Sequence, residues 1–304
     1  MNPVVAIVGP TASGKTTLAV QLALALGGEV VSTDSMQIYT GMNIGTATPT
    51  EAECRGVTHH MMNVCDPRTD VTVARFQSDA RQAIDGVRNR DRIALVTGGS
   101  GLYVAAVLDE LDFPGTDPAI RSRLEEQALE FGGPAMHNRL KLTDPVAAAT
   151  IPASNVRRVI RALEVNEITG ANYKAQLPDR VSIYPTLRIG LRIPRDQLDA
   201  RIAERVDCMF DAGFIDEVRD LQASGVIFGR TAARALGYSQ VLSFLNGEID
   251  EHQARRETVD ATKRFARRQQ RWFNPDPRIM WLDFDVPDLI DQAMVLFEEF
   301  GTRA

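Results

Sequence analysis

The sequence predicts an α/β protein built around a parallel β-sheet. Short runs rich in β-branched residues, each bounded by Gly, Pro or Asp, are typical of strands. Helix-like stretches separate the first three runs, and this alternation is typical of βαβ units. The runs are almost wholly apolar, as expected for strands that helices cover on both faces. The five expected strands are Val4–Val8, Glu29–Thr33, Arg92–Thr97, Thr186–Ile193 and Arg278–Phe284.

The middle of the chain has a different sequence pattern, because helix signals occur there without strand-like runs. Asp-Pro pairs are typical helix starts. The helices expected there are Ala119–Phe131 after Asp117-Pro118, one that begins at Asp144-Pro145, and Asn155–Ile168. We therefore expect a helical insertion at 115–185 in a core formed by 1–114 and 186–304. The chain from Arg195 to Asn274 is again expected to be mainly helical.

The composition is that of an ordinary globular protein. The chain has 304 residues, of which 44% are hydrophobic and 24% charged, with a formal net charge of −6. No apolar stretch approaches the roughly 18–20 residues that a membrane span needs. The start of the chain lacks the features of a signal peptide, and Cys54, Cys65 and Cys208 show no metal-ligand spacing. We expect a cytoplasmic protein without a membrane segment, and a monomer, because nothing implies a protein partner.

The segment GPTASGKT matches the P-loop pattern G-x-x-x-x-G-K-[ST], and it lies between an expected strand and a helical pattern. Backbone N–H groups of such a loop converge on phosphate oxygens, aided by the positive end of the helix dipole. Lys15 adds a full charge, and the Thr16 hydroxyl can bind Mg²⁺. The alternative, a Gly-rich turn without a ligand, leaves the flanking strand and helix unexplained. The predicted phosphate-binding residues are Gly9, Pro10, Thr11, Ala12, Ser13, Gly14, Lys15 and Thr16.

The expected fold is therefore a P-loop NTPase-like parallel-sheet core with a helical insertion and a mainly helical C-terminal part. An ATPase or GTPase usually has a second strand that ends in Asp, but the run RIALVTGGSG ends in Thr97 and Gly98. A carboxylate follows the Glu29–Thr33 strand instead. Asp34 is thus expected at the same sheet edge as the P-loop, where it can accept a proton from a nucleophile. The alternative is that Asp34 only stabilises a turn.

A second Gly-rich loop, GGSGLY (Gly98–Tyr103), again follows a strand and opens a helix. Its glycines permit close backbone approach, and Ser100 offers a hydroxyl and an N–H group at a helix N-terminus. Alone this is a weak signal. As the third strand-end loop on one sheet edge, it predicts a second phosphate contact.

Eight segments between Val4 and Phe273 form a recognisable set: GPTASGKT, DSMQIYTGMNIGTA, HHMMNVCDP, FQSDA, VTGGSGLYVAAVLD, RRVIRALEV, RALGYSQ and TKRFARRQQRWF. Together, and in this order, they resemble the tRNA dimethylallyltransferase (tRNA isopentenyltransferase) family. The resemblance implies transfer of a dimethylallyl group from dimethylallyl diphosphate to N6 of the adenosine 3′-adjacent to the anticodon of tRNA, with Mg²⁺ as cofactor.

The resemblance also implies roles for single residues. The family's general base falls on Asp34, and its hydroxyl near the diphosphate, usually Thr, falls on Ser100; with Lys15 these are the implied catalytic residues. Gln37 resembles a reader of the target base. The residues implied to contact the tRNA anticodon loop are Asp34, Ser35, Met36, Gln37, Ser100, Arg121, Arg158, Val159, Ile160, Arg161, Ala162, Arg234, Gly237, Tyr238, Arg267, Arg268, Gln269, Arg271 and Trp272. Arg123 is a weaker candidate.

Two positions depart from the family pattern. Thr48 stands where Lys is common, and Ser239 follows Gly-Tyr where a basic residue is usual. Both departures affect the expected local contacts and not the expected reaction.

The segment Lys263–Arg271 is basic in an acidic protein. Lys263, Arg267 and Arg271 fall at i, i+4 and i+8, with Arg264 and Arg268 beside them, so one helix face is cationic. Such a face can be merely solvated, but with the resemblance it favours contact with nucleic acid. The Arg157–Arg161 helix carries a similar choice between a surface amphipathic helix and a phosphate-contacting face. Tyr103, Phe76 and Phe265 are expected in the core.

Three other functions fit part of the sequence. A P-loop small-molecule kinase that uses ATP explains the loop and Asp34 but not the basic helix. A non-catalytic RNA-binding protein leaves the intact Lys15, Thr16 and Asp34 unexplained. An adenylate isopentenyltransferase acts on free nucleotides and does not need the long basic C-terminal part. Whether a nucleoside triphosphate also binds the P-loop stays open.

Overall fold

The computed structural model describes residues 2–173, 180–226, 228–229 and 231–303, and it divides into two compact units. The α/β unit consists of Met1–Asp109 and Ser182–Ala304, and the helical unit consists of Glu110–Val181. The sequence placed these boundaries at 114/115 and 185/186. Residues 174–179 of the expected insertion lie outside the described residues.

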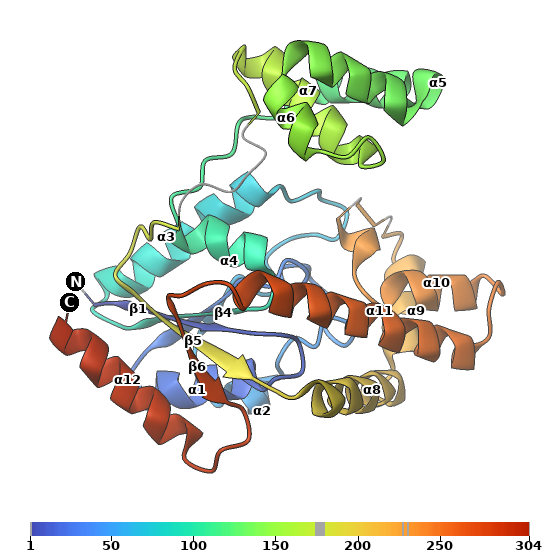
Figure 1. Cartoon of the computed structure of the whole chain (residues 1–304). Helices are drawn as coiled ribbons and strands as arrows, with labels where there is room; N and C mark the ends of the chain where they lie inside the picture. The colour runs from blue at the N-terminus through green and yellow to red at the C-terminus, as the bar shows by residue number, and fades with distance from the viewer. Residues whose placement is uncertain (1, 174–179, 227, 230, 304) are drawn as a thin grey trace. The chain divides into compact units, whose positions relative to one another are not determined.

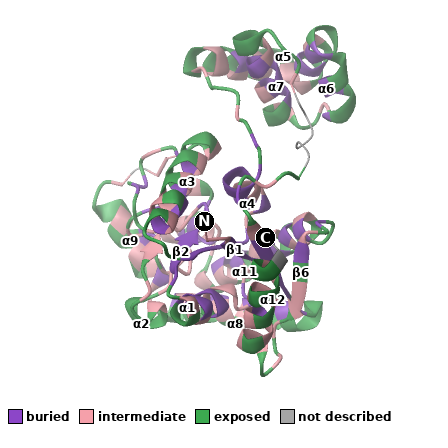
Figure 2. Ribbon diagram, turned by 90° about the vertical axis from the view of Figure 1, so that its left-hand side faces the viewer, coloured by how far each residue is buried: buried purple, intermediate pink, exposed green. Residues whose placement is uncertain are grey.

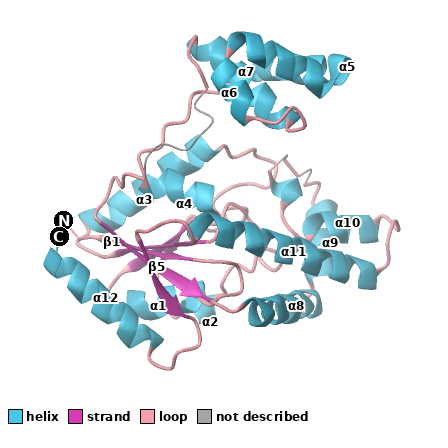
Figure 3. Cartoon of the chain, viewed as in Figure 1, coloured by secondary structure: helices cyan, strands magenta, loops and turns pink. Residues whose placement is uncertain are grey.

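The α/β unit contains a parallel sheet with the strand order β3-β2-β4-β1-β5-β6 among the described residues (Figures 1 and 3). This confirms the predicted fold class. The strands are β1 (Val4–Val8), β2 (Glu29–Ser32), β3 (His59–His60), β4 (Ala94–Gly98), β5 (Thr186–Arg192) and β6 (Ile279–Asp283). The sequence missed only β3, because two histidines are too short and too polar to read as a strand. β4 pairs with both β1 and β2, so the ends of these three strands are neighbours.

Helices cover both faces of this sheet, as the apolar strands predicted. Side chains alternate along a strand, so Val4, Ala6 and Val8 of β1 face one core, and Val5 and Ile7 face the other. The first core includes α3 (Val73–Asn89) and α4 (Gly101–Leu108); the second includes α1 (Lys15–Leu26) and α12 (Leu289–Arg303). Figure 1 shows these two pairs on opposite sides of the sheet.

The remaining helices of the α/β unit lie beyond the C-terminal ends of the strands or at its surface. They are α2 (Glu51–Cys54), α8 (Arg195–Asp211), α9 (Phe214–Ala223), the 3₁₀ turn η1 (Ala232–Arg234), α10 (Tyr238–Leu245) and α11 (Glu251–Phe273). Helix α11 packs against α8, α10 and α4, and thereby joins the C-terminal helices to the sheet edge. Figure 2 shows the buried strands enclosed by helices whose outer faces are exposed.

The helical unit contains α5 (Pro118–Thr143), α6 (Pro145–Thr150) and α7 (Val156–Thr169). Asp117, Asp144 and Asn155 each accept N-terminal backbone N–H groups, which explains the three helix starts. The chain of α5 breaks at Gly132, whose φ of 80° is left-handed, and Pro134 follows. The helix expected to end at Phe131 therefore continues in a second segment. A separate core around Leu124, Leu140 and Leu163 holds this unit together.

Candidate active site

The P-loop connects β1 to α1 and is shaped by positive φ angles. Ala12 has a φ of 62° and Gly14, the N-terminal cap of α1, a φ of 93°. Alternation of left-handed and right-handed residues turns successive N–H groups inward, which forms an anion-binding concavity. The first turn of α1 has no acidic residue that would compete with a bound anion. This backbone shape supports the prediction that the loop binds phosphate.

Side chains from distant helices hold the outer side of this loop. Arg201 of α8 donates from Nε to the carbonyl of Ala12 at 2.8 Å. The Oε1 atom of Gln269, on α11, accepts the N–H of Thr11 at 2.8 Å. Within the loop, the Nζ of Lys15 and the Oγ of Ser13 both donate to the carbonyl of Pro10. The loop is therefore braced before any ligand binds, which lowers the entropy cost of binding.

Asp34 follows β2 at the sheet edge where the P-loop follows β1. Its Oδ1 atom accepts the N–H of Met36 at 2.9 Å, so it does stabilise a turn, as the alternative reading expected. Burial raises the pKa of this carboxyl, against the lowering effects of that hydrogen bond, of Lys15 and of Arg205. A carboxylate with a raised pKa is a stronger proton acceptor. The turn and a basic role are thus compatible.

Arg205 is a site residue that the sequence analysis missed. It lies on α8, and its guanidinium acts electrostatically on both Asp34 and Lys15. Burial and this neighbouring charge lower the pKa of Lys15 to about 7, although Asp34 works in the opposite direction. Two basic groups therefore lie near one carboxylate, and a bound anion would favour the charged form of Lys15. An excess of positive charge in this place suits a polyanionic ligand.

The second Gly-rich loop follows β4 between these two sites. A side chain at Gly98 would collide with Thr33, one at Gly99 with Gln269, and one at Gly101 with Trp272. The glycines therefore allow protein groups to pack closely around this loop, and the phosphate contact stays a prediction. Ser100 is the N-terminal cap of α4, and its hydroxyl makes no capping hydrogen bond. The Ser100 hydroxyl stays a predicted phosphate contact.

The residues also fit the Mg²⁺ ion that the resemblance implies. In P-loop sites the ion takes most of its oxygen ligands from phosphates and water, so few protein ligands are needed. Thr16 places a partly exposed hydroxyl in the first turn of α1. Among the described residues, no cluster of three or more His, Cys, Asp or Glu side chains could hold a metal. A single hydroxyl ligand is enough for an ion whose other ligands are phosphate oxygens and water.

The loop after Asp34 carries the predicted base reader. Ser35 is buried, and Met36 packs against the core. The amide of Gln37 is held at both ends, because its Oε1 accepts the Ser32 hydroxyl at 2.8 Å and its Nε2 donates to the carbonyl of Ala47 at 3.2 Å. The orientation of Gln37 is thus fixed by the protein.

Helix α11 presents the expected cationic face. Arg264, Arg267, Arg268 and Arg271 are exposed, and the ion pair between Arg267 and Asp199 is long, at 3.8 Å. Phe265 is only half-buried beneath the guanidinium of Arg268, so its assignment to the core is wrong, whereas Phe76 is fully buried against the ring of Tyr103. Two predicted tRNA contacts on this helix pack inward. Gln269 is buried on the P-loop and Trp272 lies on Gly101.

The segment Arg234–Ser239 divides in the same way. Arg234 and Ser239 are exposed, but Gly237 and Tyr238 are buried. The Tyr238 ring is fully enclosed, and its hydroxyl donates to Glu217 at 2.6 Å. A buried side chain has no surface for RNA, so we assign Tyr238 to packing and hydrogen bonding. Arg234 stays a predicted contact.

The predicted contacts in the helical unit are mostly engaged within it. Val159, Ile160 and Ala162 are buried in its core, which leaves their side chains no surface for tRNA. Arg121 and Arg161 both pair with the buried carboxylate of Glu164. Arg158 is exposed and stays the best-placed predicted contact in this stretch. Arg123 pairs with Glu167.

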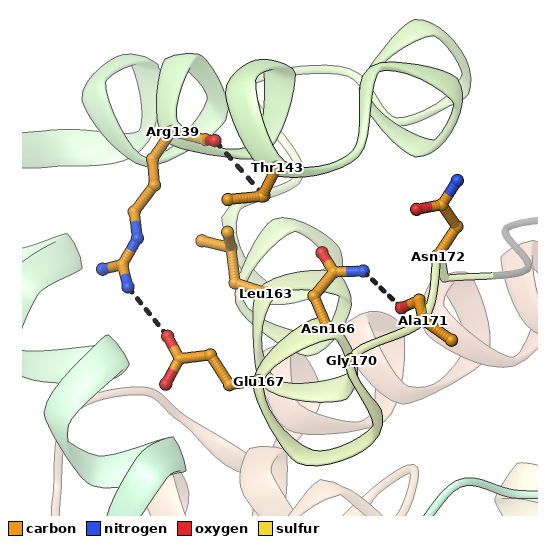
Figure 4. A pocket seen from close by; sticks show the side chains of 8 residues that line it. All are labelled: Arg139, Thr143, Leu163, Asn166, Glu167, Gly170, Ala171 and Asn172. Carbon is orange, nitrogen blue, oxygen red and sulfur yellow. Dashed lines mark hydrogen bonds and ion pairs between the residues drawn. The ribbon is translucent and has the colours of Figure 1, made fainter.

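The helical unit also contains a pocket of about 280 Å³ between α5 and α7. Figure 4 shows Arg139 reaching across it to Glu167, with Thr143 and Leu163 beside them. The lining includes none of the predicted catalytic residues. The candidate chemistry therefore rests on the strand-end loops of the α/β unit.

Comparisons with known proteins show which family the chain belongs to. Residues 37–276 match the family model described as IPP transferase. The chain is 54% identical to the tRNA dimethylallyltransferase of Thermobifida fusca over 97% of this chain and 94% of that protein. It is 55% identical to that of Frankia casuarinae over 91% of this chain and 95% of that protein. The chain belongs to the IPP transferase family.

Solved structures of this family have the same fold. The tRNA isopentenylpyrophosphate transferase of Bacillus halodurans is 38% identical, with a TM-score of 0.73 and 99% of each chain covered. A eukaryotic dimethylallyltransferase acting on tRNA, at 24% identity and a TM-score of 0.85, shows likeness of fold alone. As an IPP transferase family member, the protein is a transferase. Among the described residues, no helix is both long and apolar enough to span a bilayer.

Proposed function

We propose that this protein transfers the dimethylallyl group of dimethylallyl diphosphate to N6 of the adenosine 3′-adjacent to the anticodon in tRNA and releases diphosphate. The observation that carries the proposal is the pairing of a braced P-loop with Asp34 under the charges of Lys15 and Arg205. Family membership supports the reaction type, and the exposed arginines of α11 support an RNA acceptor.

The leaving group sets the first requirement. The allylic C–O bond breaks as its carbon becomes cationic, and the electron pair stays on the diphosphate. The P-loop amides, Lys15 and Arg205 stabilise the charge that develops there. Because Arg201 and Gln269 hold the loop in place, little reorganisation is needed as the charge forms.

The nucleophile sets the second requirement. The lone pair of the adenine N6 amine is shared with the ring, so attack on the allylic carbon leaves an acidic N–H group. Asp34 accepts that proton as the N–C bond forms, and its raised pKa favours the transfer. The target base must also leave the anticodon stack, which costs less in a single-stranded loop. We propose that Gln37 then orients the base through its fixed amide.

The Thr16 hydroxyl is the group that would hold a Mg²⁺ ion at the diphosphate. When bound, the ion offsets negative charge on the diphosphate oxygens. The Ser100 hydroxyl at the start of α4 is proposed to donate to the same group.

The test is incubation of the protein with dimethylallyl diphosphate, Mg²⁺ and unmodified tRNA that carries adenosine 3′ of the anticodon. We expect prenylated adenosine in the nuclease digest, detected by mass spectrometry, and release of diphosphate. AMP and ATP plus small acceptors serve as the competing substrates. Prenylation of free AMP alone, or phosphate transfer from ATP without prenylation, would refute the proposal.

A further inference from the structure

The carboxylate of Glu217, on α9, is surrounded by hydrogen-bond donors from two distant segments. Its Oε2 atom accepts the N–H groups of Asn43 at 2.8 Å and Ile44 at 2.7 Å. Its Oε1 atom accepts the N–H of Gly45 at 3.2 Å and the hydroxyl of Tyr238 at 2.6 Å. Three successive backbone donors of one loop are therefore satisfied by one side chain, which is an anion-binding arrangement filled from within.

The same loop is fixed sterically. A side chain at Gly45 would come within 2.2 Å of the Phe214 ring and 2.5 Å of the Tyr238 ring. These two rings pack edge to face, with centroids 5.0 Å apart. Position 45 must therefore be glycine for the loop to lie against these rings. A small displacement of the loop would break both the packing and the hydrogen bonds to Glu217.

From this anchor a series of hydrogen bonds runs to the candidate site. The N–H of Ala47 donates to the carbonyl of Ile44 at 2.9 Å, which closes the turn. The carbonyl of Ala47 accepts from Gln37, whose Oε1 accepts the Ser32 hydroxyl. The Ser32 Oγ in turn accepts the backbone N–H of Asp34 at 3.2 Å.

We propose that Glu217 is a positioning residue, which through the 43–47 loop fixes the orientation of Gln37 and the turn at Asp34 for the target base. The proposal rests on the proposed function, since it assigns the acceptor side of that same site. It also gives the RALGY segment a role, because Tyr238 acts by holding Glu217 rather than by contacting RNA. The P-loop is not part of this series, so the diphosphate side of the site is independent of Glu217.

The test compares Glu217→Gln with Asp216→Asn. Both remove one negative charge from α9, but Asp216 is exposed and pairs with Arg219 at the surface. A glutamine keeps one accepting oxygen and turns an NH₂ group toward backbone N–H donors. We expect faster hydrogen–deuterium exchange of residues 43–45 in Glu217→Gln and not in Asp216→Asn. This readout needs no activity and so does not depend on the proposed function.

The kinetic readout separates positioning from a merely structural role. We expect the single-turnover rate of tRNA prenylation to fall about tenfold or more, as for loss of a charged hydrogen-bond acceptor, while the KM for dimethylallyl diphosphate stays within about twofold. The fraction of prenyl groups on other adenosines of the anticodon loop should rise. Tyr238→Phe keeps the ring packing but removes one hydrogen bond to Glu217, so it should show the same changes with a smaller magnitude. This variant replaces Glu217→Gln in the test if Glu217→Gln does not fold.

Unchanged exchange at residues 43–45 would overturn the inference. So would faster exchange with rates and site selectivity equal to those of Asp216→Asn, because Glu217 would then only anchor a loop. Wild-type protein that does not prenylate tRNA would refute the proposed function instead. The failures of the two proposals are therefore distinguishable.

Discussion

The α/β unit and the helical unit use their charged residues in different ways. At the sheet edge, Lys15, Asp34 and Arg205 share one small region, and the pKa values of Lys15 and Asp34 both move toward neutrality. In the helical unit, the buried carboxylate of Glu164 is met by Arg121 and Arg161. Both arrangements set two basic groups against one carboxylate. In the helical unit both arginines form ion pairs with that carboxylate, whereas at the sheet edge Lys15 and Arg205 act on Asp34 through longer-range electrostatics.

This difference teaches how to read charged residues in this chain. Ionisable groups with strongly shifted pKa values often mark a functional site, because their arrangement costs folding stability. Charged groups that pair with one another inside a unit have a structural role. The two basic helices differ in the same way. Helix α11 has exposed arginines. On α7, the guanidinium of Arg161 donates hydrogen bonds to Glu164 and to the carbonyls of Pro114 and Gly115.

The largest expected effect is at Asp34. We expect Asp34→Asn to lower the rate of the chemical step about 10²–10⁴-fold, the range for loss of a general base, because asparagine cannot accept the N6 proton. The Oδ1 atom of asparagine can still accept the N–H of Met36, so the turn should persist. Single-turnover assays give the rate, and filter binding of tRNA gives the affinity. A rate within a few-fold of wild type would show that Asp34 is not the base.

The next effect concerns architecture. We expect Glu164→Gln to destabilise the helical unit by about 3 kcal/mol, because it removes the charge that two arginines share at a buried position. Burial raises the pKa of Glu164, but hydrogen bonds from Arg121 and Arg161 outweigh it and the pKa is lowered. The stabilisation is therefore present above the ordinary Glu pKa and is lost as the pH falls through the lowered value.

Urea unfolding, followed by hydrogen exchange of peptides from α5 and α7, measures this effect. The matched control is Glu167→Gln, since Glu167 also forms ion pairs with two arginines, Arg123 and Arg139, but is partly exposed. The control should cost less than about 1 kcal/mol, as for surface pairs. Equal losses in the two variants would contradict the contrast between buried and surface charge.

A smaller effect follows from the lowered pKa of Lys15. The free protein loses the ammonium charge as the pH rises through about 7, whereas a bound diphosphate favours the charged form. Diphosphate binding should therefore take up protons, and affinity should fall by up to about tenfold per pH unit above that value. Calorimetric titration with inorganic diphosphate between pH 6 and pH 9, in buffers of different ionisation enthalpy, measures both quantities.

Lys15→Arg is the control for this pH dependence, because arginine stays charged throughout the range. The titration of diphosphate itself is common to both proteins, so the difference between the two profiles isolates Lys15. Identical profiles and identical proton uptake would mean that the ammonium of Lys15 is fully charged in the free protein.

The sequence predicted those parts of the site that depend on the backbone. The P-loop follows from a fixed spacing of Gly, Lys and Thr, and Asp34 follows from its place after a strand. Arg205 carries no such signal, because it is one arginine on an amphipathic helix and reaches Asp34 only through the packing of α8. Nor does the sequence show that the side chain of Gln269 turns inward to Thr11.

The stretch 158–162 shows a different limit. The sequence left this helix open between a surface amphipathic helix and a phosphate-contacting face. The structure buries Val159 and Ile160 in the core of the helical unit. The family resemblance nevertheless nominated the whole stretch as tRNA contacts. A motif marks a segment, whereas burial decides which of its side chains can reach a partner.

The smallest expected effect compares the two basic helices. We expect Arg271→Gln on α11 to weaken tRNA binding a few-fold and to reduce the slope of log affinity against log salt by about 0.7–0.9, the value for one phosphate contact. Arg158→Gln on α7 tests the helical unit in the same way. The control is Arg256→Gln, an exposed arginine about 22 Å along α11 from Arg271 at 1.5 Å per residue. If all three variants shift the slope equally, the effect comes from net charge and the helices are not distinct RNA contacts. A reduced slope for Arg271→Gln with an unchanged slope for Arg256→Gln would place the phosphate contact at the end of α11 that carries Gln269, beside the P-loop.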